Sequence, residues 1–202
     1  MKPVTRDEIL DLTAYEKARP EIQARVLKEK APRRIHLGEA LTFLFENRDT
    51  VCYQVQEMIR AERMVKESDI GHELETYNEL LGRQGELGAA LLIEIDDPQL
   101  RDARLREWMG LPGSLYVKTA SGRKVRATFD PRQVGQDRLS SVQYLKFDTG
   151  GEVPVAIGAD HPRCQLEVAR PGEWQSQHFW VPRTAKPVWH RVQVALVGVF
   201  SA

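Results

Sequence analysis

Polar side chains capable of chemistry are concentrated between Glu46 and Asn78, in the segments FENRDT, QVQEMIRAER and GHELETYN. Some of them are carboxylates or imidazoles, which are ligand types that suit iron, manganese or zinc. The candidate metal ligands are Glu57, Glu62, His72 and Glu73. A divalent metal held there would polarise a substrate or activate water. A metal-binding protein or a metal-dependent enzyme is therefore one hypothesis.

The same residues have a simpler interpretation, because charged side chains along a helix commonly form a solvated face. Carboxylate metal sites in helical bundles usually carry Glu-x-x-His motifs, and this chain has none. A single histidine such as His72 more often lies on a helix surface or between helices. Both interpretations stay open at this point.

A second group of reactive side chains lies in the segment GADHPRC, which we predict to be a turn. Asp160, His161 and Cys164 there would suit a ligand, a metal or a reactive thiolate, although Asp and Pro are also ordinary turn residues. Cys52 and Cys164 are the only cysteines and form no C-x-x-C motif. The chain therefore lacks a disulfide framework, which is typical of a reducing cytoplasm.

Composition excludes several other functions. The chain has 29 Lys and Arg against 29 Asp and Glu, so no overall field attracts nucleic acid or an anionic membrane. No stretch approaches the roughly 20 apolar residues that cross a bilayer, and no glycine-rich phosphate loop or G-x-S-x-G occurs. We expect a cytoplasmic protein that binds neither membrane nor nucleic acid. A small-ligand or RNA-binding module using Arg48, Arg60 and Tyr77 is the least favoured hypothesis.

Helices are predicted for most of the first half. Thr5 and Glu8 form a capping box at the start of a helix, and Pro20 suits the first turn of a second helix. Helix-forming residues follow Asn47, and Ser68 is a suitable cap for a helix that ends at Gly82. Between these helices, we expect a hairpin whose apolar runs flank Gly38 and Glu39.

Strands are predicted for most of the second half, in LGAALLIEI, SSVQYLKF and RCQLEVA and in a hairpin about Ser121 and Gly122. One helix starting at Asp97 interrupts them. The fold class expected is α+β, with a helical N-terminal half packed on a mostly antiparallel sheet from the middle and C-terminal half. We expect one domain over residues 1–169 and a tail over residues 170–202 that is rich in Trp and Pro.

A family resemblance rests on the words FENRDT, QVQEM, RAER, HELETYNELL, LLIEI, SSVQYLKF and DHP, in that order up to about His161. The chain resembles the bacterial domain-of-unknown-function family 3501. The resemblance implies a cytoplasmic bacterial protein associated with rubrerythrin-like and iron–sulfur proteins. The polar residues shared with the family's words include the four candidate metal ligands and Pro162. The others, which we take as candidate ligand-binding or interaction residues, are Glu46, Asn47, Arg48, Gln54, Gln56, Arg60, Tyr77, Asn78 and His161.

Two hypotheses lead. The favoured one is an accessory or interaction protein in a redox or iron–sulfur pathway, which binds a rubrerythrin-like or iron–sulfur partner through the polar helix face. The alternative is the metal-binding protein or metal-dependent enzyme with a Glu/His cluster.

Overall fold

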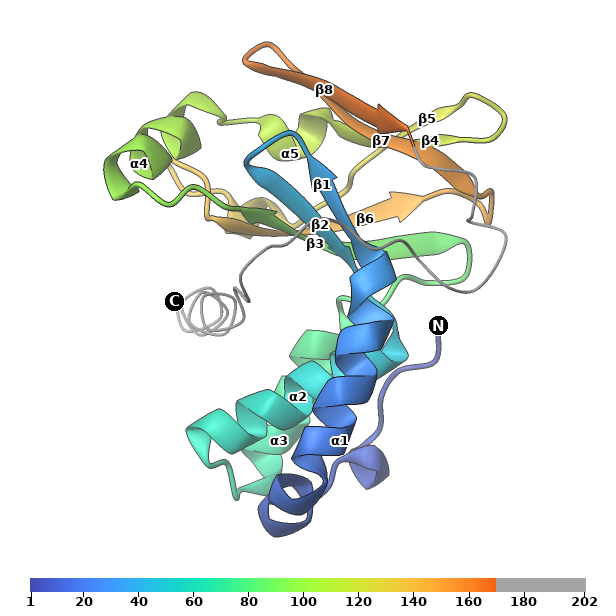
Figure 1. Cartoon of the computed structure of the whole chain (residues 1–202), viewed down its shortest axis with the longest axis vertical. Helices are drawn as coiled ribbons and strands as arrows, with labels where there is room; N and C mark the ends of the chain where they lie inside the picture. Colours follow the sequence, from blue (N-terminus) through green and yellow to red (C-terminus); the bar gives the residue numbers. More distant parts are fainter. Residues whose placement is uncertain (170–202) are drawn as a thin grey trace.

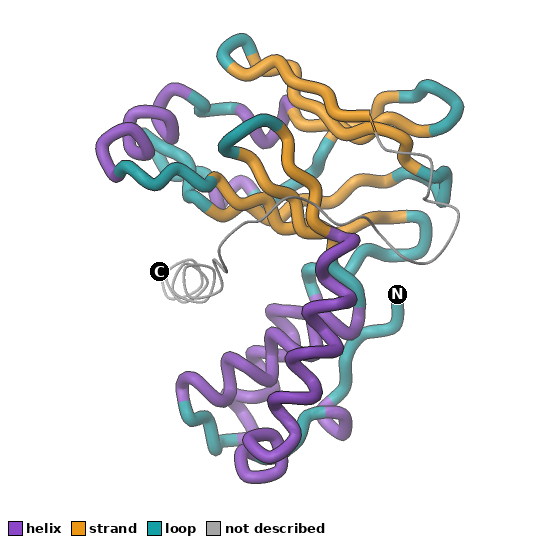
Figure 2. The backbone as a smooth tube through the Cα atoms, in the orientation of Figure 1, coloured by secondary structure: helices purple, strands orange, loops and turns teal. Residues whose placement is uncertain are grey.

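The computed structural model describes residues 1–169, and in this range the helices and strands separate into two bodies (Figure 1). Three helices form a bundle, and the strands form two stacked antiparallel sheets with two short helices at one end (Figure 2). The expected α+β class, with a helical N-terminal half and antiparallel sheets in the middle and C-terminal half, is confirmed. The predicted tail lies outside the described residues.

The bundle consists of α1 (Leu12–Lys30), α2 (Arg48–Glu62) and α3 (Glu67–Asn78). Asp11 caps α1 by accepting from the amide of Ala14, and Asn47 caps α2 by accepting from the amide of Thr50. Apolar residues from the three helices and from the N-terminal segment form its core. That core contains Val4, Ile9, Val51, Val55, Met58, Ile59, Ile70, Leu74, Tyr77, Leu80 and Leu81.

The start of the chain differs from the prediction. The Thr5–Glu8 capping box forms, but it closes a single turn of 3-10 helix, η1 (Arg6–Glu8). The two predicted helices are then one helix, since α1 runs through Pro20 without a break. Tyr15 before the proline and Val26 after it are both buried. Packing on both sides therefore outweighs the backbone hydrogen bond that a proline removes.

The strands form two four-stranded sheets within the described range, and all their pairings are antiparallel. Sheet A has the order β1 (Arg34–Leu37), β2 (Leu41–Phe45), β3 (Glu86–Ile93), β6 (Val142–Asp148). Sheet B has the order β5 (Lys124–Arg126), β4 (Leu115–Thr119), β7 (Pro154–His161), β8 (Cys164–Ala169). The connecting pieces are η2 (Ala31–Arg33), α4 (Pro98–Glu107), α5 (Leu111–Ser114) and η3 (Pro131–Gln133).

The two sheets approach each other along both sides, and we refer to the flattened sandwich that they form as the barrel. On one side, Thr128 beyond β5 bridges to Lys146 of β6. On the other side, the β1–β2 hairpin touches β8, where a Cβ at position 38 would lie 2.8 Å from Cδ1 of Leu166. Gly38 also has a φ of +67°, a backbone angle that residues other than glycine rarely adopt. The turn thus favours glycine at this position, and the hairpin lies close to β8 there.

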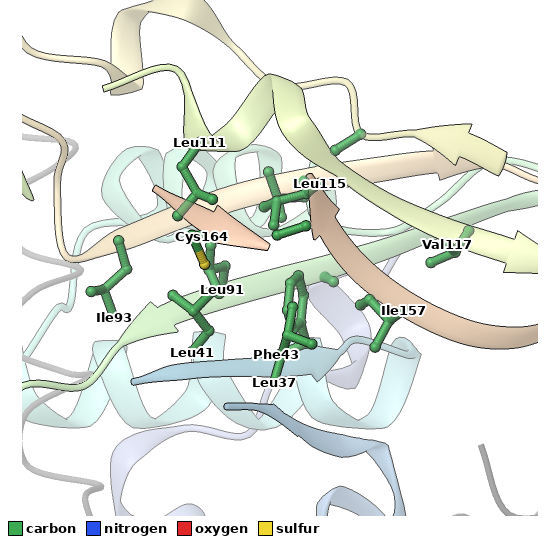
Figure 3. Packing of buried hydrophobic residues seen from close by; sticks show 14 of the residues in the cluster. Leu37, Leu41, Phe43, Leu91, Ile93, Leu111, Leu115, Val117, Ile157 and Cys164 are labelled. Atoms are coloured by element: carbon green, nitrogen blue, oxygen red, sulfur yellow. The ribbon is translucent and has the colours of Figure 1, made fainter. Parts of the chain in front are cut away.

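The interior of the barrel is filled from both sheets (Figure 3). Phe43 and Leu91 of sheet A and Leu115 of sheet B are completely shielded from solvent, and Leu111 of α5 closes one end. Because alternate residues of a strand point to opposite faces, the residues between them lie on the outer faces of the sheets.

Two strand details also differ from the prediction. The hairpin loop of β1 and β2 holds residues 38–40, since Leu37 pairs with Leu41, so it is one residue longer than expected. The segment expected to be a turn is largely strand, because Asp160 and His161 end β7 and Cys164 begins β8. Only residues 162 and 163 form the turn between these strands.

Candidate functional site

Glu57 lies at the centre of a polar network between α1 and α2. Its carboxylate accepts a hydrogen bond of 2.6 Å from the hydroxyl of Tyr15. Arg19 donates two hydrogen bonds to the same carboxylate, from Nε at 2.7 Å and from Nη2 at 3.0 Å. The helix spacing explains this geometry, because residues four apart, such as Tyr15 and Arg19, share one helix face.

Arg60 approaches the network from the next turn of α2. Its Nε lies 3.4 Å from Oε1 of Glu57, and its Nη1 lies 3.7 Å from Glu16. Unlike Arg19, Arg60 donates no hydrogen bond to any residue in the described range, and its Nε is shielded from solvent. The side chains of Arg19 and Arg60 stay 28% and 30% exposed. Two guanidinium groups are therefore held at the surface by one buried carboxylate.

The surroundings fix the charges of this network. Burial alone would raise the pKa of Glu57, but hydrogen bonds from Arg19 and Tyr15 outweigh it and hold the pKa below its usual range. Burial, followed by the hydrogen bond to Glu57, raises the pKa of Tyr15. Near neutral pH, the network therefore combines an ionised carboxylate with a neutral phenol that can donate to it.

Two predicted amide residues hold the N-terminal segment, residues 3–10, which we refer to as the strap. Asn78 accepts from the amide of Val4 at 2.7 Å and donates to its carbonyl at 2.9 Å. Gln56 bonds both backbone groups of Leu10 in the same way, at 2.9 and 3.0 Å. Arg48 adds an ion pair to Glu8. These side chains seal the bundle core with the strap.

The predicted residues near the start of α2 form hydrogen bonds where this helix follows sheet A. The buried carboxylate of Glu46 accepts from the hydroxyl of Thr50, and Asn47 caps the helix while donating to Glu29 at 2.7 Å. Gln54 donates within its own helix, to the carbonyl of Thr50 at 3.3 Å. Lys30 is buried close by, and this burial lowers its pKa despite the opposing charge of Glu46.

Tyr77 and His161 lie apart from the Glu57 network. Tyr77 is buried in the bundle core, where burial first and the charge of Glu73 next raise its pKa. His161 is on sheet B, where its Nε2 lies 3.1 Å from the carbonyl of Met109 and its Nδ1 accepts from the amide of Arg163 at 3.2 Å. With both nitrogens occupied, His161 fastens the β7–β8 turn to the segment after α4.

The four candidate metal ligands do not converge. Glu57 is committed to the α1–α2 network, whereas Glu62 and His72 are exposed on α2 and α3. Burial raises the pKa of Glu73, with the charge of His72 opposing the rise and that of Glu62 adding to it. Within residues 1–169, no group of three or more His, Cys, Asp or Glu could hold a metal ion. The arrangement therefore gives no support to the metal hypothesis.

Sequence reasoning missed the α1 side of this network. It selected Glu57 and Arg60 but not Tyr15 and Arg19, which hold the carboxylate. A signal was present, since Tyr15 and Arg19 are four residues apart and so share one helix face. This spacing indicates a contact with Glu57 only once α1 and α2 are known to pack against each other.

The fold and the network define a class of protein with a three-helix bundle on a flattened antiparallel barrel. Within this class, the chain belongs to the family described as Protein of unknown function (DUF3501), whose sequence model matches residues 3–177. The match extends beyond the end of the resemblance noted at His161.

The chain is also similar to a solved structure, the crystal structure of a novel protein of unknown function from Burkholderia pseudomallei K96243. The two share 30% sequence identity with a TM-score of 0.77, over 84% of this chain and 93% of that chain. No curated protein matches the sequence. In the described residues, none of the helices combines the length and the apolar character needed to span a membrane.

Proposed function

We propose that the protein is an accessory protein that binds a partner of a redox or iron–sulfur pathway through the exposed face around Arg19 and Arg60. The family resemblance supports the choice of a rubrerythrin-like or iron–sulfur protein as the partner. The observation that carries the choice of surface is Arg60, whose guanidinium group is fixed beside Glu57 but donates no hydrogen bond within the described range.

Prior ordering makes these arginines suitable for binding. An arginine usually loses side-chain freedom when it enters an interface, and that loss weakens association. Here the Glu57 carboxylate already orients Arg19, and Tyr15 orients the carboxylate. Arginine is also common among the residues that dominate binding energy in interfaces. The partner group that fits Arg60 is a carboxylate, which can accept two parallel hydrogen bonds from one guanidinium.

The test is an anaerobic affinity purification from native lysate with the full chain, followed by binding measurements with the purified candidate. A rubrerythrin-like or iron–sulfur protein should be retained by the wild type. Arg60→Ala should weaken its binding by roughly tenfold or more, as expected for the loss of a charged hydrogen-bonded contact.

Arg123→Ala is the matched control. Arg123 is also a partly exposed arginine in an ion pair, with Glu152, but it belongs to the β4–β5 hairpin of sheet B. It should bind the partner like the wild type. The proposal fails if no redox protein is retained, or if Arg60→Ala and Arg123→Ala bind equally well.

A further inference from the structure

Three polar side chains line up across the outer face of sheet A. His36 of β1 pairs directly with Thr42 of β2, and the amide of Glu94, just beyond β3, donates to the carbonyl of Ala40. Thr42 is 1% exposed and lies between two residues of the barrel core, so its side chain is on the opposite face.

The hydrogen bonds of Thr42 have only one consistent direction. Its hydroxyl donates to Oε2 of Glu94, which as a carboxylate has no hydrogen to give. The same oxygen lies 2.9 Å from Nδ1 of His36. Since the single hydroxyl hydrogen is already used, His36 must donate from Nδ1. A neutral His36 then carries its lone pair on Nε2.

The other ring nitrogen of His36, Nε2, has no role in this hydrogen-bond chain. It has no hydrogen-bond partner among the described residues, and the side chain is half-buried. Burial first and the charge of Arg34 next lower the pKa of His36, against the opposing effect of Glu94, so the ring is neutral near pH 7. The second oxygen of Glu94, Oε1, is shielded from solvent and has no hydrogen-bond partner in the described range. Through Thr42, the Glu94 carboxylate therefore orients the neutral ring with its lone pair on Nε2.

We propose that His36, Thr42 and Glu94 form a proton-accepting binding site for a small oxyanion that carries an O–H group, such as a phosphate. Nε2 of His36 accepts the O–H, and the cationic side chain of Arg34, two residues earlier on the same face of β1, attracts the negative charge. The site lies on sheet A and is independent of the partner surface on the helices.

The test uses nitrogen NMR of the full chain, which distinguishes the two histidine tautomers, followed by titration with inorganic phosphate. His36 should be mainly in the Nδ1–H form, and phosphate should shift its signals to saturation. Sulfate has the same shape but no hydrogen near neutral pH, so it should bind roughly tenfold more weakly. Exposed His72 is the internal control, and its signals should not follow the titration.

Thr42→Val keeps the shape of the side chain but removes the hydroxyl. The variant should lose the excess of the Nδ1–H form and bind phosphate roughly tenfold more weakly. If this variant fails to fold, Glu94→Gln supplies an amide that can donate to the Thr42 hydroxyl, and it should likewise reduce the excess of the Nδ1–H form. An Nε2–H tautomer in the wild type, equal shifts of His36 and His72, or equal affinity for phosphate and sulfate would each overturn the proposal.

Discussion

The barrel and the bundle are stabilised by different interactions, although each has its own apolar core. In the barrel, fully buried residues such as Phe43 and Leu91 pack between two sheets. In the bundle, the apolar core is bordered by a buried carboxylate with its two arginines and by amide side chains that bond backbone groups of the strap. Apolar packing is tolerant of detail, whereas directional bonds fix one alignment of the helices. The polar residues of the helices therefore have a structural role in addition to any binding role.

The largest effect is expected in the barrel. Phe43→Ala should lower the free energy of unfolding by about 3–5 kcal/mol, because it removes a completely buried ring and leaves a cavity. Chemical denaturation would measure the change. Val155→Ala, at a side chain 39% exposed on β7, should change stability by less than about 0.5 kcal/mol. Equal losses would contradict the assignment of the barrel core.

The next effect is expected in the bundle, from Arg19→Ala. This change leaves Glu57 buried with weaker compensation, which costs about 3–5 kcal/mol for a fully buried pair. Since Arg19 is 28% exposed, solvent reduces the expected loss to about 2 kcal/mol. Arg106→Ala, which breaks exposed ion pairs on α4, should leave the denaturation midpoint nearly unchanged. A similar midpoint for both variants would show that the network does not stabilise the bundle.

The hydrogen bonds of Asn78 to the strap should contribute less to the free energy of unfolding than the Glu57 network does. Asn78→Ala removes two part-buried hydrogen bonds to Val4, at about 0.5 kcal/mol each. Hydrogen exchange at the amide of Val4 should become faster in this variant. Gln54→Ala loses only a bond within its own helix and should leave that exchange rate unchanged. If the exchange rate is unchanged in Asn78→Ala, the hydrogen bonds of Asn78 do not stabilise the strap.

The smallest effect is a dependence on pH. The pKa of Glu57 is lower in the folded state than the ordinary value of about 4.3, so its contribution is complete above that value and disappears as the pH falls through the folded pKa. Glu57→Gln should therefore destabilise the protein most near neutral pH and progressively less in acid. Glu75→Gln, at an exposed position of α3, serves as the control and should follow the wild-type profile.

The sequence predicted the elements whose pattern is local. The helix that starts after Asp97 and the hairpin about Gly122 depend on neighbouring residues, and both are confirmed. Strand β7 was missed because its reason is tertiary. A Cβ at Gly158 would lie 2.6 Å from the ring of Tyr116, which crosses this position from β4. Glycine weakens a strand locally, but here it makes room for a neighbouring aromatic ring.

The candidate site was predicted only in part, for the same physical reason. Local spacing identified Glu57 and Arg60 as polar residues of one helix, but it did not show which of them is buried. That distinction depends on Arg19, which is 38 residues away from Glu57 in the chain. A single sequence does not show which residues pair across two helices. The sequence alone therefore could not distinguish the metal hypothesis from the interaction hypothesis for Glu57 and Arg60.

The contact between Gly38 and Leu166 has a consequence for synthesis on the ribosome. The bundle core comes from residues 4–81, so nearly all of it exists early in translation. The barrel can close only after β8 has emerged, and the β1–β2 hairpin keeps an unpaired edge until β3 pairs with β2. Such edges are sites of intermolecular association. The bundle flanks this hairpin in sequence on both sides and can form its core before the barrel closes. We expect the folded bundle to shield the nascent hairpin from association with other chains.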